Sequence, residues 1–160
     1  MLVPPSYSVN LGSKMAKIEL IVGTTLGSAE YVADELAAQL EDLGHETQVH
    51  LTAELSVLDP KCLWLIVSST HGAGDLPENI QPFFEEIERE KPDLSRTKYA
   101  LCAIGDSSYD TFCQGPEKLI EAMENCGAQV YVDKIQIDVQ YDPIPEEPAQ
   151  AWLSSWQDKL

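Results

Sequence analysis

Three short polar stretches of this sequence contain residues that could bind a ligand. The first reads GTTLGSAE and spans residues 23–30. Its hydroxyls at Thr24, Thr25 and Ser28 and an expected helix start could cradle a phosphate, because unpaired backbone N–H groups and the helix dipole attract an anion. The stretch has no lysine, whereas a nucleoside-triphosphate loop would end in Gly-Lys-Ser/Thr. An ordinary helix start, with Ser28 as the cap, explains the same residues equally well.

The second stretch reads THGAGD and spans residues 70–75. Gly72 and Gly74 would let the backbone approach a ligand closely, in conformations that side chains forbid. His71 is a flat ring that could cover one face of a planar ligand, although a single histidine in a loop is more often simply solvated. Asp75 is expected to cap the helix that follows. This stretch therefore predicts one wall of a narrow ligand crevice.

The third stretch reads GDSSYDTFC and spans residues 105–113. Tyr109 and Phe112 lie three positions apart in a polar loop, away from the expected core faces. An aromatic ring there suits stacking on a flat heterocycle, and each good contact contributes ~0.5–1.5 kcal/mol. The alternative, a ring folded back onto the domain, fits Phe112 better than Tyr109. Cys113 would need a paired base to act as a nucleophile, and no histidine is near it in the sequence.

Alternating strand and helix patterns would bring these three stretches together. Buried strands are predicted at residues 18–23, 47–51, 62–69, 99–105 and 129–137. Strands that alternate with helices pair in parallel through right-handed crossovers. The predicted fold class is therefore α/β, a doubly wound sheet of five parallel strands with helices on both faces, in the order 2-1-3-4-5 known from flavodoxin. The polar stretches then follow strands 1, 3 and 4, and such sheets bind ligands outside the carboxyl ends of their strands.

Four helices are predicted between and after these strands. The first begins at Ser28 and stops at Gly44, the second ends before Pro92, the third begins at Pro116 and the fourth at Pro148. In each helix, apolar residues at helical spacing form one face that is expected to pack on the sheet. In chain order, the four faces consist of Val32, Leu36, Leu40 and Leu43; Ile80, Phe83, Phe84 and Ile87; Leu119, Ala122, Met123 and Cys126; and Trp152, Leu153, Trp156 and Leu160.

The excess of acidic residues restricts the kinds of macromolecule that this protein could bind. Ten basic and 27 acidic side chains leave a net charge of −17, which argues against nucleic-acid and anionic-membrane partners and favours a basic protein surface. A solvated acidic surface without a partner explains the same charge. No apolar run reaches the ~20 residues of a membrane span. We expect residues 1–15 to be a flexible N-terminal extension, or residues added in cloning, and residues 16–160 to form one domain.

The cysteines bear on the redox environment. Cys62, Cys102, Cys113 and Cys126 form no CxxC pair and no metal-ligand spacing with the three histidines. We therefore expect free thiols, no bound metal and a reduced, cytoplasmic location.

The three polar stretches resemble those of the flavodoxin family. The resemblance rests on GTTLGSAE, SSTHGAGD, GDSSYDTFC and the final IPEEPAQAWL, in this order, and covers about residues 16–160. It is strongest for the MioC-type short-chain flavodoxins, which are akin to the FMN domains of diflavin reductases. It implies a small protein that binds flavin mononucleotide (FMN) and shuttles single electrons, without a substrate of its own.

The resemblance also implies roles for individual residues. Residues 24–29 would hold the ribityl phosphate, residues 69–72 would line one edge of the isoalloxazine, and Tyr109 would be the outer stacking ring. His71 would take the inner stacking position, and the carbonyl of Gly72 would turn towards the flavin N5 when the flavin takes up an electron. The implied cofactor-binding residues are Thr24, Thr25, Leu26, Gly27, Ser28, Ala29, Ser69, Thr70, His71, Gly72, Ala73, Gly74, Ile104, Gly105, Asp106, Ser107, Ser108, Tyr109, Phe112 and Cys113.

Two departures from the family pattern have consequences for cofactor binding, and the extra loop of long-chain flavodoxins is also absent. Leu26 stands where a threonine is common and removes one phosphate-binding hydroxyl, so weaker FMN binding than in long-chain flavodoxins is expected. His71 makes the inner face less apolar and sensitive to pH. Residues 129–143 are too few for the extra loop that splits strand 5 in long-chain flavodoxins.

The resemblance implies a flavodoxin or ferredoxin–NADP reductase as electron donor and a reductively activated enzyme as acceptor, with biotin synthase as the candidate for this subfamily. We expect a monomer. A phosphoacceptor signalling domain of the same winding would need an acid pair after strand 1, where this chain has Gly-Thr-Thr. An FMN-dependent quinone or flavin reductase would need a substrate pocket, for which no dedicated segment is seen. A third alternative is an interaction domain that has lost its cofactor. Leu26 keeps this alternative open, because it removes one phosphate-binding hydroxyl.

Overall fold

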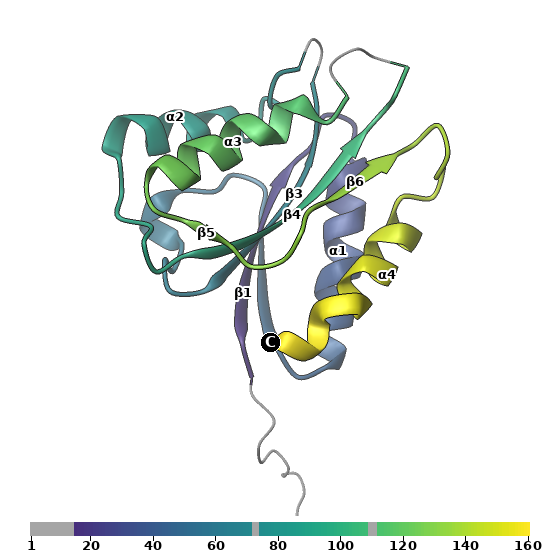
Figure 1. Ribbon diagram of the computed structural model, residues 1–160, viewed down its shortest axis with the longest axis horizontal. Coiled ribbons are helices and arrows are strands. Elements are labelled where there is room, and N and C mark those ends of the chain that lie inside the picture. The colour runs from purple at the N-terminus through teal and green to yellow at the C-terminus, as the bar shows by residue number, and fades with distance from the viewer. Residues whose placement is uncertain (1–14, 72–73, 109–111) are drawn as a thin grey trace, which may run out of the picture.

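A parallel β-sheet runs through the middle of the molecule, with two helices on each face (Figure 1). This computed structural model describes residues 15–71, 74–108 and 112–160. Helices α1 (Ser28–Asp42) and α4 (Glu146–Trp156) cover one face. Helices α2 (Gln81–Glu90) and α3 (Gln114–Asn125) cover the other. In the described part of the chain, no helix is long and apolar enough to span a bilayer.

The strand order confirms the predicted doubly wound topology. The described strands are β1 (Lys17–Gly23), β2 (Glu46–His50), β3 (Leu63–Ser69), β4 (Lys98–Gly105), β5 (Gln129–Val130) and β6 (Ile135–Asp138). They run in the order β2-β1-β3-β4-β5, with β6 also paired to β4, and every pairing is parallel. The described residues also form two short 3₁₀ helices, η2 (Leu55–Val57) and η3 (Gln157–Lys159).

The prediction of one continuous fifth strand was wrong, because β5 and β6 are separate. Tyr131 and Val132, between them, both pack against the core on the α1–α4 side. Successive side chains of a strand point to opposite faces, so the chain must leave strand geometry to bury both. The Tyr131 hydroxyl also donates a hydrogen bond to the Lys159 carbonyl, at 2.6 Å. Packing against the C-terminal helix therefore divides the strand.

Two apolar clusters hold the helices on the sheet. The cluster under α2 and α3 contains Trp64, Phe83, Leu101, Leu119 and Met123, all at most 1% exposed. The cluster under α1 and α4 contains Leu20, Leu36, Leu40, Leu65, Cys102 and Leu153, all fully buried. Strands β1, β3 and β4 are thus buried on both faces, which explains their unbroken apolar runs.

Several helix ends differ from the prediction by one or two residues. The N-cap of α1 is Gly27, at φ +94°, not Ser28. Helices α3 and α4 begin two residues before Pro116 and Pro148, because proline fits anywhere in a first turn whose N–H groups have no intrahelical acceptor. Leu43 lies beyond the last turn of α1 and is 45% exposed, so it does not belong to the buried face.

Candidate functional site

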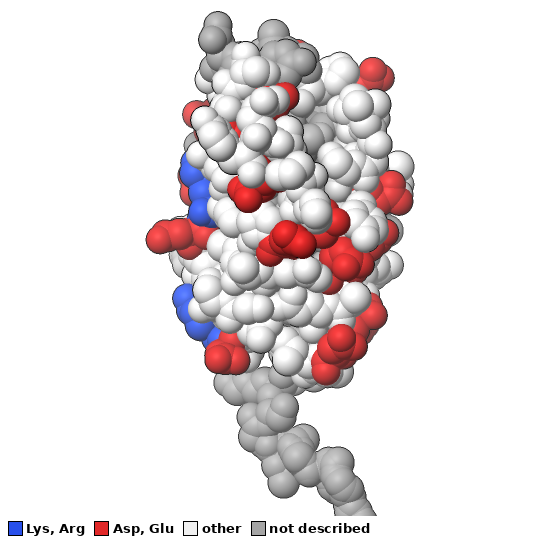
Figure 2. Space-filling view, turned by 90° about the vertical axis from the view of Figure 1, so that its right-hand side faces the viewer, with Lys and Arg blue, Asp and Glu red and all other residues white. Residues whose placement is uncertain are grey.

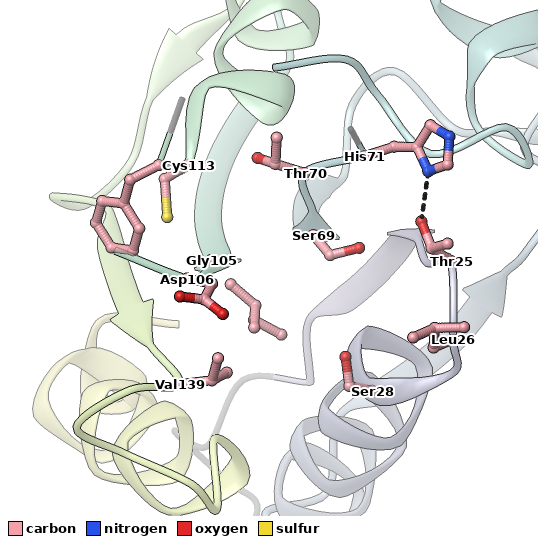
Figure 3. A pocket seen from close by; sticks show the side chains of 12 residues that line it. Thr25, Leu26, Ser28, Ser69, Thr70, His71, Gly105, Asp106, Cys113 and Val139 are labelled. Atoms are coloured by element: carbon pink, nitrogen blue, oxygen red, sulfur yellow. Dashed lines mark hydrogen bonds between the residues drawn. The ribbon is translucent and has the colours of Figure 1, made fainter. Parts of the chain in front are cut away.

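A pocket of about 380 Å³ lies at the carboxyl ends of β1, β3 and β4 (Figure 3). Its volume is in the range typical of small-molecule sites. The lining residues come from the last residues of β3 and β4, from the first residue of α1 and from the loops after β1, β3, β4 and β6: Thr25, Leu26, Ser28, Ser69, Thr70, His71, Ile104, Gly105, Asp106, Phe112, Cys113 and Val139. The structure therefore brings the three polar stretches together around one cavity.

The loop after β1 forms the anion-attracting end of this pocket. The Thr24 hydroxyl accepts a hydrogen bond from the Gly27 N–H at 2.8 Å, which closes the turn before α1. The first intrahelical bond runs from the Tyr31 N–H to the Gly27 carbonyl, so the N–H groups of residues 28–30 have no acceptor within the helix. The hydroxyls of Thr25 and Ser28 line the pocket beside them. Since the described lining residues include no Lys or Arg, N–H dipoles and hydroxyls would bind an anion here.

The loop after β3 is held by hydrogen bonds on both sides. His71 and Asp75 exchange backbone hydrogen bonds of 2.7 and 2.9 Å. The His71 Nδ1 lies 3.3 Å from the Thr25 hydroxyl oxygen, across the pocket mouth. The Thr70 hydroxyl accepts the Gly115 N–H at 3.1 Å, which ties this loop to the start of α3. His71 is thus a half-buried pocket residue with a partner, not merely a solvated one.

Asp75 does not cap α2, as the sequence suggested. The N-cap of that helix is Ile80, and no side chain bonds to the helix start. The Asp75 carboxylate instead accepts a hydrogen bond from the Lys118 ammonium on α3, at 2.9 Å. This bond, with the charge of Lys118, lowers the pKa of Asp75. The pair links the loop after β3 to α3 at the surface of the protein.

The loop after β4 supplies the opposite wall. A Cβ atom at Gly105 would lie 2.8 Å from the Cys113 Sγ and 2.9 Å from the Phe112 Cδ1. The Phe112 ring therefore folds back over Gly105 and packs against the α2–α3 core, while one side faces the pocket. Burial raises the pKa of the Cys113 thiol to about 12, so it stays protonated at neutral pH and is a poor nucleophile.

Asp106 places a carboxylate in the pocket lining. Its carboxylate accepts hydrogen bonds from the Ser108 hydroxyl and N–H, at 2.6 and 2.9 Å, and these lower its pKa. It also accepts one from the Gln140 amide, at 2.9 Å. The Asp138 carboxylate accepts the Ser107 N–H at 3.1 Å. The loops after β4 and β6 are thus linked, and this link brings Val139 to the pocket.

Some predicted residues do not line the pocket. Ala29 is fully buried in the core under α1, so only its backbone is available to a ligand. Thr24, Gly27, Ser107 and Ser108 make hydrogen bonds within the loops without lining the cavity, and Gly74 does not line it either. Gly72, Ala73 and Tyr109 lie outside the described residues.

Sequence reasoning missed Val139. It follows β6, which pairs with β4 from Cys102↔Ile135 to Gly105↔Asp138, so its loop lies beside the loop after β4. The position of Val139 could have been inferred from the topology. The strand that contains residues 135–138 runs parallel to its neighbours, so the residue after it must lie at the same edge of the sheet as the three loops. Within the described residues, no group of three His, Cys, Asp or Glu side chains could hold a metal ion.

Comparison with known proteins identifies the family. A family model described as flavodoxin matches residues 20–152. This chain belongs to the flavodoxin family. Protein MioC of Escherichia coli (strain K12) is 44% identical to this flavodoxin, over 91% of this chain and 99% of that protein. A cysteine-to-alanine mutant of flavodoxin from Pseudomonas aeruginosa is 31% identical, with a TM-score of 0.80, and the match covers 88% of this chain and 95% of that one.

A more distant structure shares the fold. It is a lysine-to-glycine mutant of Fusobacterium nucleatum flavodoxin bound to flavin mononucleotide, at 15% identity and a TM-score of 0.73, and the match covers 89% of this flavodoxin and 96% of that chain. The pocket described above has what a flat, singly phosphorylated group requires. It offers helix N–H groups and the hydroxyls of Thr25 and Ser28, with His71 beside Thr25. Its lining also includes the Phe112 ring.

Proposed function

We propose that this flavodoxin binds FMN in the pocket at the ends of β1, β3 and β4 and carries single electrons between redox partners. One observation carries the proposal: an anion-attracting helix start and an aromatic-walled cavity lie side by side, in a member of the flavodoxin family. FMN, when bound, supplies the one-electron chemistry, and the protein supplies binding, orientation and electrostatics.

Separate groups of the chain would hold the two ends of the cofactor. The free N–H groups at the start of α1 and the hydroxyls of Thr25 and Ser28 would bind the phosphate. His71 and the loop after β4 would flank the flavin ring, with Phe112 restricting water on that side. The ionised Asp106 would disfavour additional negative charge in the pocket and so favour a low reduction potential. More distant carboxylates count less, because salt screens them beyond about 8 Å.

The charge of the surface supports a basic partner. Figure 2 shows the side that carries α1 and α4, with acidic side chains spread over it and basic ones only at an edge. Helix α1 has five acidic residues, α4 has two, and neither has a Lys or Arg. By family resemblance, the donor would be a flavodoxin or ferredoxin–NADP reductase and the acceptor a reductively activated enzyme, with biotin synthase as the candidate. The protein would act as a carrier, not as a catalyst with its own substrate.

Two measurements on the purified protein test this function. Calorimetry with FMN should give one binding site per chain. The FMN-loaded protein should then leave NADPH unoxidised on its own and should transfer electrons to cytochrome c when a flavodoxin reductase is added. A pocket that binds no FMN at high concentration would refute the cofactor, and rapid NADPH oxidation without a reductase would refute the carrier role.

A further inference from the structure

One side chain outside the pocket is bonded to the start of the phosphate-binding loop. Asn79 lies between β3 and α2, and its Oδ1 accepts the Thr24 N–H at 2.9 Å. Its Nδ2 donates to the Val22 carbonyl at 2.7 Å and to the Leu51 carbonyl at 2.8 Å. One amide thus uses its acceptor and both of its donor hydrogens, and it joins the ends of β1 and β2 to the segment before α2.

These bonds lead directly to the cap of α1. Asn79 holds the backbone of Thr24, and the Thr24 hydroxyl in turn accepts the Gly27 N–H at 2.8 Å. The segment that carries Asn79 packs closely on the end of β1, since a Cβ at Gly23 would lie 3.0 Å from the Ile80 Cγ2. A shift of Asn79 would therefore move the turn that presents the free N–H groups of the helix start.

We propose that Asn79 is a positioning residue for the FMN phosphate. Asn79 does not line the pocket. It acts through Thr24 and Gly27, because its hydrogen bonds fix the position of the loop after β1. The inference rests on the proposed function, and it predicts which residue contributes to the selectivity of the pocket for FMN over riboflavin. Riboflavin has the same ring system as FMN but no phosphate, so the Asn79 contacts should matter for FMN and hardly for riboflavin.

The test compares the affinities of the two flavins, measured by quenching of flavin fluorescence. Asn79→Ala should weaken FMN binding about tenfold relative to the natural protein, since several neutral hydrogen bonds that order the phosphate loop are lost. Riboflavin binding should change by less than about twofold. Gln81→Ala is the matched control, because the Gln81 amide donates to the Leu76 carbonyl in the same segment, at 2.8 Å, without reaching β1. It should leave both affinities within about twofold.

The possible failures are distinguishable. Equal losses for FMN and riboflavin in Asn79→Ala, or an unchanged FMN affinity, would overturn the positioning role while the natural protein still binds FMN. A natural protein that binds neither flavin would overturn the proposed function itself.

A measurement without a variant covers the case in which Asn79→Ala does not fold. In the flavin-free natural protein, the Thr24 amide should exchange its hydrogen at least about tenfold more slowly than the amide of Leu26, a loop residue whose side chain is 94% exposed. Equal exchange rates at the two amides would show that the Asn79 bond does not hold the loop.

Discussion

The His71 Nδ1 lies 3.3 Å from the hydroxyl oxygen of Thr25, within hydrogen-bond distance (Figure 3). The two residues are 46 positions apart and belong to the loops after β3 and β1. Because β1 and β3 are neighbours in the sheet, this contact joins the phosphate-binding side of the pocket to the side that would flank the flavin ring. It also gives the histidine of the THGAGD stretch a partner that no local pattern indicates.

The first prediction is that Thr25 and His71 are energetically coupled. In a double-mutant cycle with Thr25→Val and His71→Ala, the free energies of urea unfolding should deviate from additivity by about 0.5–1 kcal/mol, the net contribution of one neutral hydrogen bond. Ser28→Ala combined with His71→Ala is the control, and its effects should add. Additive effects in the first cycle would mean that the two loops are independent.

The second prediction concerns Leu26, whose side chain is 94% exposed at the rim of the pocket. Leu26→Thr should tighten FMN binding about threefold to tenfold, because a hydroxyl is added beside the phosphate-binding N–H groups. The unfolding free energy should change by less than about 0.5 kcal/mol, since the leucine buries little surface. Leu26→Val has the shape of threonine without its hydroxyl and is the control for calorimetry. Equal FMN affinities of these two variants would contradict the prediction.

The strand order and the meeting of three loops could be predicted because they depend on local patterns. Apolar runs mark buried strands, and alternation with helices implies parallel pairing, so the loops after β1, β3 and β4 had to share one edge of the sheet. The sequence could not predict contacts that tertiary packing decides. The Asp75 carboxylate is hydrogen-bonded to Lys118 on α3, 43 positions away, and not to the start of the helix that follows it in the sequence. The division of β5 from β6 follows from the packing of both Tyr131 and Val132 on the α1–α4 side of the sheet.

The third prediction is that Gly115→Ala destabilises the protein strongly, although alanine is the better helix former. A Cβ at Gly115 would lie 2.4 Å from the Asp75 carbonyl oxygen and 3.2 Å from the Thr70 Cα, both backbone atoms. We expect the unfolding free energy to fall by about 2–3 kcal/mol, as measured by urea denaturation. Gln114→Ala changes the exposed residue next to it and should stay within about 0.5 kcal/mol. Similar unfolding free energies of the two variants would mean that the loop after β3 can move to accommodate the added methyl group without loss of stability.

The fourth prediction is a pH dependence of stability that comes from His45. Its Nδ1 accepts the Ala16 N–H at 3.0 Å, and burial lowers its pKa below 6.5. Below pH 6.5 the unfolded chain therefore binds more protons at this site than the folded one, so the stabilising contribution is complete above pH 6.5 and is lost as the pH falls through the lower, folded-state pKa. The unfolding free energy should thus decrease from pH 7 to pH 5.

His45→Gln tests this dependence, because glutamine can still accept the Ala16 N–H but does not titrate. The variant should lose less stability than the natural protein between pH 7 and pH 5, as measured by urea denaturation at each pH. Above about pH 8 His45 is neutral in both the folded and the unfolded chain, so the difference between the two proteins should be constant there, which serves as the internal control. Parallel curves over the whole range would mean that the proton on His45 has no part in folding.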